Sequence, residues 1–159
     1  MAITHKATVK VFGALYSITG DGAPTTSTFG VVGDIYLDMD AESATYGNSY
    51  LCTDVDGSTY TWALDNREDA RIALAIQRVE TDYLRIRGKA FETDDDDNTV
   101  YPVGAGLVAA EMALYNLGII EGRGEQSGSV ADKSATYESK LAGYPVSIVG
   151  QIARYVGVV

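Results

Sequence analysis

EDARIALAIQRVETDYLRIRGKAF, which runs from Glu68 to Phe91, carries the strongest secondary-structure pattern of the sequence. Its apolar residues recur every three or four positions, as on one face of an α-helix; they are Ile72, Ile76, Val79, Tyr83 and Ile86. Basic residues gather at its carboxyl end, where they complement the helix dipole, and Gly88 suits a left-handed stop. The pattern predicts a helix of about six turns, opened by a capping box of Asp65 and Glu68.

Two further helices are predicted downstream. YPVGAGLVAAEMALYNLGII (101–120) predicts a helix from after Pro102 to Leu117, with an apolar face made of Leu107, Ala110, Leu114 and Leu117. YPVSIVGQIARYV (144–156) predicts a third helix that starts at Pro145, a favoured first-turn residue, with the face Ile148, Ile152 and Tyr155. The connector between them, 118–143, is longer than a compact three-helix domain needs. Within it, 129–137 is predicted to extend and pair with a neighbouring chain.

Upstream of residue 65 the apolar residues recur about every two positions, as in a β-strand, rather than every 3.6 positions, as in an α-helix. Short runs rich in β-branched and aromatic residues predict four strands, at 8–12, 34–39, 49–53 and 59–64. Asp54–Ser58 is predicted to be a hairpin turn, and 20–27 a surface loop. Four aromatic residues are expected to share a small core face: Tyr36, Tyr50, Tyr60 and Trp62. The fold class is therefore predicted as α+β, with a small antiparallel β-module at 1–64 and a three-helix domain at 65–159.

Composition excludes several classes of function. The 159 residues carry a formal net charge of −10, which argues against a general nucleic-acid-binding surface because phosphate affinity comes from clustered Lys and Arg. The sequence contains no P-loop, no GxGxxG, no HExxH and no Cys/His cluster. His5 is the only histidine, and Cys52 the only cysteine, so no intrachain disulfide is possible. We expect no enzyme activity and no cofactor.

The sequence predicts neither a leader nor a membrane anchor. The first twenty residues hold no apolar run followed by a small-residue cleavage site, so no signal peptide is expected. No stretch approaches eighteen apolar residues, so no membrane span is expected.

The order of segments from 65 to 159 resembles the head–tail connector, or adaptor, proteins of tailed bacteriophages. TDYLRIRGKAF (81–91) is similar to the end of that family's first long helix and its basic, Gly-containing turn. YPVGAGLVAAEMALYNL (101–117) resembles its second helix, and GEQSGSVADKSATYES (124–139) its Ser/Glu-rich loop with a terminal Tyr. GYPVSIVGQIARYV (143–156) resembles its closing helix, which starts at Pro. The β-module departs from the family, which often begins with a short helix; it resembles small β-units of phage structural proteins.

The resemblance implies a structural protein of the virion, made in the host bacterial cytoplasm and located at the head–tail interface. Members form a homo-oligomeric ring of about twelve subunits, which docks beneath the portal protein and carries the next connector or tail-completion protein. DNA passes through the ring without specific binding, and an acidic channel wall would repel phosphate. The β-module could contact the capsid.

Candidate interface residues follow from charge and from the resemblance. The basic group Arg85, Arg87 and Lys89 could meet an acidic surface of a neighbouring subunit, or could only complement the helix dipole. The remaining interface candidates lie in the long loop and the last segment: Ser129, Val130, Asp132, Tyr137, Tyr144, Ile152, Tyr155 and Val159.

The run Asp94, Asp95, Asp96 and Asp97 is the sharpest charge feature. It has three interpretations: a solvated loop, an acidic patch that faces the channel or a basic partner, or a Ca²⁺ or Mg²⁺ site. The run lacks the alternating oxygen pattern and the glycine of a calcium loop, so no metal site is expected. In the acidic-patch interpretation, a head-to-tail ring would bring this run against the basic group of the next subunit.

A second class of function stays open. The β-half could be a tail- or fibre-associated binding module that recognises a carbohydrate or a host surface through exposed aromatic residues, with the helices serving only to multimerise it. The eleven tyrosines are consistent with such a surface, and equally with a small core or a subunit interface.

Overall fold

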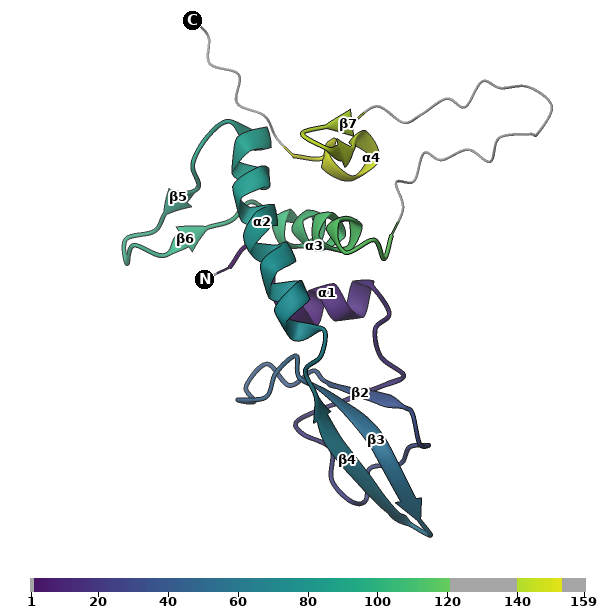
Figure 1. Ribbon diagram of the computed structural model, residues 1–159. Helices are drawn as coiled ribbons and strands as arrows, with labels where there is room; N and C mark the ends of the chain where they lie inside the picture. Colours follow the sequence, from purple (N-terminus) through teal and green to yellow (C-terminus); the bar gives the residue numbers. More distant parts are fainter. Residues whose placement is uncertain (1, 121–139, 153–159) are drawn as a thin grey trace, which may run out of the picture. The chain divides into compact units, whose positions relative to one another are not determined.

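The computed structural model describes residues 2–120 and 140–152 and has a mixed α+β fold (Figure 1). The chain divides into two compact units. His5–Leu74 form the first, here the sheet unit; residues 2–4 and the described residues from Ala75 onward form the second, here the helix unit. This division falls inside the first long helix, whereas the sequence prediction placed the boundary between residues 64 and 65.

The sheet unit contains one short helix and a four-stranded sheet with the strand order β1-β2-β3-β4. Its elements are α1 (Lys6–Phe12), β1 (Ile18–Gly20), β2 (Ile35–Asp38), β3 (Ser49–Asp56) and β4 (Thr59–Asp65). The predicted strands at 34–39, 49–53 and 59–64 are confirmed. A turn joins β3 to β4 as predicted, but it is shorter than Asp54–Ser58: β3 continues to Asp56, and only Gly57, with a φ of 59°, and Ser58 lie between the strands. The sheet is not purely antiparallel, because β1, which was not predicted, pairs with β2 in parallel.

Aromatic rings fill part of the sheet unit, as predicted. The ring of Tyr36 lies 6.4 Å from that of Tyr50 and 5.7 Å from that of Trp62. Leu37 and Cys52 are completely buried beside them. Tyr50, Tyr60 and Trp62 are only half-buried, so the core face is smaller than the four aromatic residues suggested.

The predicted strand at 8–12 is wrong, because these residues lie in helix α1. A run of five residues is too short for its apolar pattern to distinguish a strand from a helix, so tertiary contacts decide which of the two forms. Nδ1 of His5 accepts a hydrogen bond from the backbone N–H of Ala7 and caps the helix. The helical turn also places the ammonium group of Lys10 in the interior, where it has three partners.

Helix α2 (Asp69–Arg87) is the long helix predicted from the apolar pattern of residues 68–91. All five residues of its predicted apolar face are buried, and Gly88 ends it with a φ of 76°. The predicted capping box is wrong. Asp65 is the last residue of β4, and its carboxylate binds the guanidinium of Arg67 with two contacts of 2.7 Å, so the helix begins later, at Asp69.

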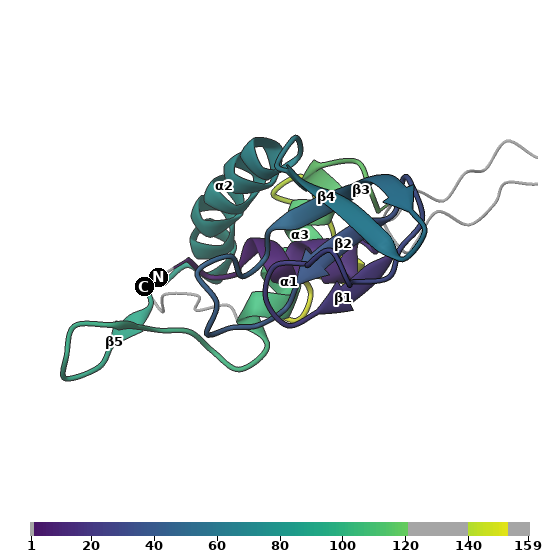
Figure 2. The ribbon, with the colours of Figure 1, turned by 90° about the horizontal axis from the view of Figure 1, so that it is seen from below.

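After α2 the helix unit contains the β5–β6 hairpin, helix α3 and the docked segment 140–152. The bounds are β5 (Glu92–Thr93), β6 (Thr99–Val100), α3 (Ala105–Asn116), β7 (Lys140–Leu141), β8 (Tyr144–Pro145) and α4 (Val146–Val149). Figures 1 and 2 both show the hairpin extending to the side of α2 away from α3. No helix in the described ranges is both long and apolar enough to cross a membrane.

Two details of the predicted second and third helices need correction. Of the predicted face, Ala110 and Leu114 are buried, but Leu107 is half exposed. The buried face of α3 also includes Val108, Ala109, Met112 and Ala113. The third helix follows Pro145 as predicted, but α4 has only four residues and ends before Gly150. Glycine disfavours helix continuation because of its backbone entropy. Ile148 and Ile152 are buried as predicted, and Tyr155 lies outside the described residues.

Candidate interaction surface

Tyr144 fastens the segment 140–152 to both long helices of the helix unit. Its hydroxyl donates a hydrogen bond to Oδ2 of Asp82 on α2, at 2.7 Å. The same oxygen accepts a hydrogen bond from Nδ2 of Asn116, at the end of α3, also at 2.7 Å. Burial, and then the bond to Asp82, raise the pKa of Tyr144 to about 12. The phenol is therefore a neutral donor throughout the physiological pH range, and the contact is structural.

Arginines on α2 complete this contact. Arg85 donates from one terminal nitrogen to Oδ1 of Asp82 at 2.8 Å and to the carbonyl oxygen of Ala142 at 3.3 Å. Nε of Arg78 lies 3.7 Å from Oδ2 of Asp82. A single carboxylate, itself buried, thus receives the tyrosine hydroxyl and two guanidinium groups.

The turn from α2 into the hairpin is built around Arg87. This arginine is buried, and one of its terminal nitrogens donates to the carbonyl oxygens of Lys89 and Ala90, at 3.2 and 2.6 Å. Its guanidinium carbon lies 5.0 Å from the ring centroid of Phe91. Phe91 also contacts Tyr83 and Tyr101, with ring centroids 5.7 and 4.8 Å apart. The cluster fixes the direction in which the hairpin leaves the helix.

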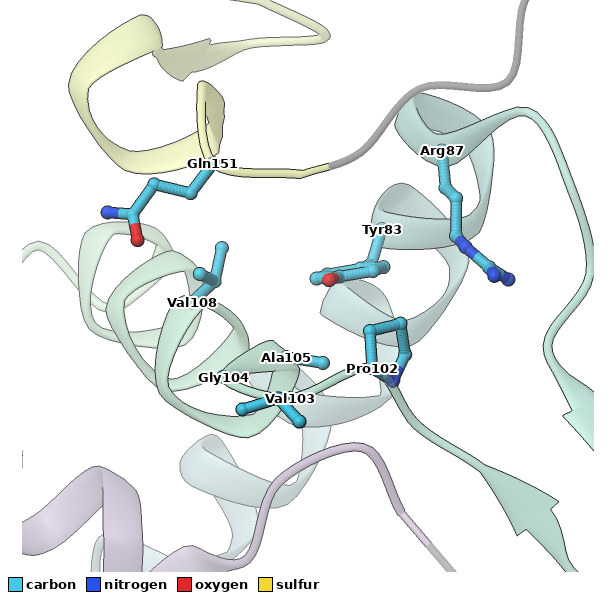
Figure 3. A pocket seen from close by; sticks show the side chains of 8 residues that line it. All are labelled: Tyr83, Arg87, Pro102, Val103, Gly104, Ala105, Val108 and Gln151. Carbon is cyan, nitrogen blue, oxygen red and sulfur yellow. The ribbon is translucent and has the colours of Figure 1, made fainter.

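A small pocket of about 200 Å³ lies beside this turn (Figure 3). It is lined by Tyr83, Arg87, Pro102, Val103, Gly104, Ala105, Val108 and Gln151. In Figure 3 the guanidinium of Arg87 extends away from Val108 and Gln151, on the far side of Tyr83. Burial raises the pKa of Tyr83, so its hydroxyl is a neutral hydrogen-bonding group.

The predicted acidic run forms the tip of the β5–β6 hairpin. Oδ1 of Asp94 accepts the backbone N–H groups of Asn98 and Asp96, at 2.8 and 3.0 Å, and these bonds, led by that of Asn98, lower the pKa of Asp94. Asp97 takes a left-handed φ of 60°. All four aspartates are exposed, and in the described part of the chain none of them forms an ion pair. The tip is therefore a hydrogen-bonded turn that concentrates negative charge.

A groove of about 610 Å³ runs between the base of this hairpin and α2. It is lined by Gln77, Glu80, Thr81, Leu84, Phe91, Thr99 and Tyr101, none of which is basic. Oε1 of Glu80 accepts the backbone N–H of Ile3 at 3.0 Å. Burial, followed by the charge of Glu80, raises the pKa of Tyr101. The groove therefore combines an aromatic and aliphatic floor with acidic surroundings.

The structure separates the three predicted basic residues. The side chain of Arg85 is the most exposed of the three, at 61%, and that of Lys89 is 48% exposed. Arg87 is buried against its own chain, and Nζ of Lys89 pairs with Glu92 at 3.1 Å. Sequence reasoning missed Arg78, whose side chain is 73% exposed. The available signal was its spacing, because Arg78 and Arg85 are seven positions apart and share one face of a helix.

The other interface candidates divide into two groups. Tyr144 and Ile152 are buried within the helix unit. Six lie outside the described residues: Ser129, Val130, Asp132, Tyr137, Tyr155 and Val159.

The sheet unit carries a buried ionic network that the sequence did not reveal. Nζ of Lys10 lies 2.6 Å from Oδ1 of Asp69 and donates to the carbonyl oxygen of Gly47 and to Oγ of Ser49, both at 2.9 Å. Nζ of Lys6 binds the other oxygen of Asp69 at 2.8 Å. Burial opposes the charge on Asp69, but the bonds from the two lysines outweigh it and lower the pKa of this carboxyl.

Asp38 is a second buried carboxylate of the sheet unit. It accepts hydrogen bonds from Oγ1 of Thr45 at 2.6 Å and from the backbone N–H groups of Gly22 and Asp40, both at 2.9 Å. Burial disfavours the ionised form of Asp38, but these hydrogen bonds together outweigh burial and lower the pKa of this carboxyl. The carboxylate holds the loops on either side of β2 together.

His5, the one histidine of the sequence, has a structural position. Besides capping α1, its ring stacks on that of Tyr46 at 4.6 Å. Burial, followed by the charges of Lys6 and Lys10, lowers its pKa. Within residues 2–120 and 140–152, no three His, Cys, Asp or Glu side chains are grouped so that they could hold a metal ion.

Comparisons with known proteins give no assignment. The chain matches no protein-family model, no curated protein and no solved structure.

Proposed function

We propose that the protein is a structural subunit of the head–tail connector of a tailed bacteriophage. In this role copies of the chain form a ring that docks beneath the portal protein, extends the DNA channel and carries the next connector or tail component. The proposal rests on the resemblance of residues 65–159 to that family, on the anchoring of residues 140–152 and on the acidic charge of the chain.

The observation that carries the proposal is the way in which the closing segment is anchored. Tyr144 ties residues 140–152 to α2 and α3, and α3 ends at Asn116. The described residues on both sides of 121–139 therefore belong to the same folded unit. In the family that the sequence resembles, the corresponding loop contacts neighbouring subunits. An anchored base of this kind is what such a loop requires, because binding through a loop is stronger when its ends are already fixed.

Charge supports the same role. The net charge is −10, and the hairpin tip concentrates four aspartates on an exposed turn. A ring with acidic surfaces repels the phosphates of a passing DNA duplex, so the duplex moves without being retained. Acidic tips also attract basic surfaces of partner proteins during assembly.

The experiment that tests the proposal is an electron-microscopy reconstruction of phage particles that contain this chain. We expect ring density between the portal and the tail into which the helix unit fits. A matched preparation from a phage with the reading frame disrupted should accumulate DNA-filled heads without tails. Density at a fibre tip or on the outside of the capsid, with normal tail attachment in the disrupted phage, contradicts the proposal.

One observation favours the alternative, a binding module. Phe29, Val31 and Val32 are largely exposed, although their loop is firmly held. Nε1 of Trp62 donates to the carbonyl oxygen of Thr28 at 3.1 Å, and Asp34 accepts the backbone N–H of Val31 at 2.8 Å. A fixed loop that presents apolar side chains is typical of a docking surface.

The variant Phe29→Ser separates the two functions. Its side chain is 72% exposed, so the substitution should not unfold the sheet unit. Under the connector proposal, heads carrying the variant still receive tails. Under the binding-module alternative, tails attach normally but adsorption of the particles to host cells falls.

A further inference from the structure

Helix α2 presents two chemically different flanks on either side of its buried face. At about 100° of rotation per residue, Val79, Tyr83 and Ile86 point into the core of the helix unit. Gln77, Glu80 and Leu84 project to one side of that face, toward the groove and the hairpin. Arg78 and Arg85 project to the other side, and their exposed side chains lie on one line along the helix.

The groove flank is acidic and partly apolar. Leu84, Phe91 and Tyr101 give it an apolar and aromatic floor, and the exposed Asp94–Asp97 turn stands at the end of the adjoining hairpin. The carboxylates of Asp95 and Asp96 make no hydrogen bond within the described residues. Of these two residues, only Asp96 takes part in the hydrogen bonds of the turn, through its backbone N–H. Both carboxylates are available to a partner.

The arginine flank is basic and has hydrogen-bonding capacity left over. Asp82 accepts a hydrogen bond from one nitrogen of Arg85 and lies 3.7 Å from Nε of Arg78, but a guanidinium carries five N–H donors. Two guanidinium groups against one shared carboxylate leave a net positive surface. Their contact with Asp82 also limits the rotamers of the two side chains, so little conformational entropy is lost when a further carboxylate binds.

We propose that the acidic hairpin and groove of one copy of this chain receive the Arg78–Arg85 flank of α2 from a second copy. Charge complementarity favours a second copy as the occupant, because every copy carries both surfaces on opposite flanks of one helix. Such a contact joins unlike surfaces head to tail, and its repetition closes a ring when the rotation per copy permits. Only the closing of a ring rests on the proposed function; the contact between two copies does not.

This assignment differs from the pairing that the sequence suggested. Arg87 is used inside its own chain, and Lys89 pairs with Glu92 at the base of the same hairpin. Of that basic group, Arg85 alone belongs to the exposed flank, and Arg78 is its partner there.

The test measures self-association of the full chain by sedimentation velocity over a range of concentration and salt. We expect association in low salt that weakens about tenfold or more when the ionic strength rises from 0.05 to 0.5 M, since exposed charges are then screened. Asp95→Lys/Asp96→Lys and Arg78→Glu/Arg85→Glu should each abolish it. The fourfold variant, in which both surfaces are reversed, should recover it.

A matched control separates the contact from a general effect of charge. Asp54→Lys/Asp56→Lys makes the same change of charge on exposed positions of the β3–β4 hairpin and should leave association in place. Thermal unfolding of each variant establishes that it is folded. Should Arg78→Glu/Arg85→Glu unfold, Arg78→Gln/Arg85→Gln serves instead and should weaken association at least severalfold.

The outcomes that overturn the proposal are definite. They are a wild-type chain that stays monomeric at its highest soluble concentration in low salt, a hairpin variant that associates like the wild type, and a fourfold variant that fails to recover. Failure of the connector proposal is recognised separately. Association can follow the predicted pattern while the reconstruction places the chain away from the portal vertex, in which case the contact stands and the connector role falls.

Discussion

Two buried polar networks hold segments of this chain against α2, and they use opposite chemistry. In the sheet unit, Lys10 brings a full positive charge into the interior and meets Asp69, at the start of the helix. In the helix unit, Tyr144 brings a neutral hydroxyl to Asp82, further along the same helix. Both place a carboxylate of α2 opposite a donor from a distant part of the sequence.

The two networks should tolerate the loss of a partner to different degrees. A buried ammonium group without its partner retains a large desolvation penalty, so a charged network fails as a whole. A buried neutral phenol that loses its hydrogen-bond partner costs less free energy than an unpaired buried charge. The sheet unit should therefore respond sharply to single substitutions, whereas the helix unit should respond gradually.

Lys10→Met should give the largest effect. The side chain of Lys10 is 3% exposed, and its removal leaves the carboxylate of Asp69 with Lys6 alone. We expect a loss of about 3–5 kcal/mol in the free energy of unfolding, measured by urea denaturation. The fluorescence of Trp62, the one tryptophan of the chain, reports on the sheet unit.

Lys6→Met is the matched control for that variant. Lys6 binds the same carboxylate at 2.8 Å, but its side chain is 27% exposed. We expect a loss of about 1 kcal/mol or less. Equal losses for the two variants would show that burial of Lys10 is not what makes its network critical.

Tyr144→Phe should give the next largest effect. It removes the hydroxyl bonds to Asp82 and Asn116 while the ring stays buried, for a loss of about 1.5–3 kcal/mol. Hydrogen exchange within 140–152 should become faster, because this segment loses its anchor. Tyr115→Phe is the control, since Tyr115 contacts Tyr144 by its ring; exchange should remain unchanged in it, and an equal increase in both variants would contradict the anchor.

A pH dependence of the sheet unit follows from its lowered carboxyl pKa values. The pKa of Asp69 and that of Asp38 are lower in the folded chain than the ordinary aspartate value near 3.8. Their contribution to stability is therefore complete above that value and is lost as the pH falls through the folded pKa. We expect the urea midpoint seen by Trp62 to fall below about pH 4. In Asp38→Asn the fall should be shallower, and an unchanged slope would exclude Asp38 as its source.

The smallest effect should come from the hairpin tip. Asp95→Ser/Asp96→Ser changes exposed side chains that make no hydrogen bond within the described residues, so the free energy of unfolding should change by no more than about 0.5 kcal/mol. The same variant should weaken self-association. A large loss of stability instead would show that these carboxylates support the fold rather than a contact.

The elements that the sequence predicted correctly are those whose pattern is local. The apolar face of α2 extends over several turns, so its period is unambiguous, and Gly88 marks its end by its own backbone preference. The strands β3 and β4 are joined by a short turn at Gly57, so their pairing is local as well.

The features that were missed depend on distant residues. Helix α1 forms because Lys10 reaches Ser49 and Asp69, neither of which lies near it in the sequence. The parallel pairing of β1 with β2 joins Ile18 to Tyr36 and has no signal in a short window. The inward turn of Arg87 has no signal in the sequence either, because a cluster of charges at a helix end does not reveal which of them is buried.

The burial of Cys52 has a practical consequence. This thiol, the single one in the sequence, is fully buried between β2 and β4, where a maleimide reagent reaches it only after local opening of the sheet. A cysteine introduced on the surface can therefore be labelled selectively in the native chain. A fluorophore pair placed in this way, one dye on the hairpin tip and one on the arginine flank of separate copies, would report by energy transfer when one molecule approaches the next.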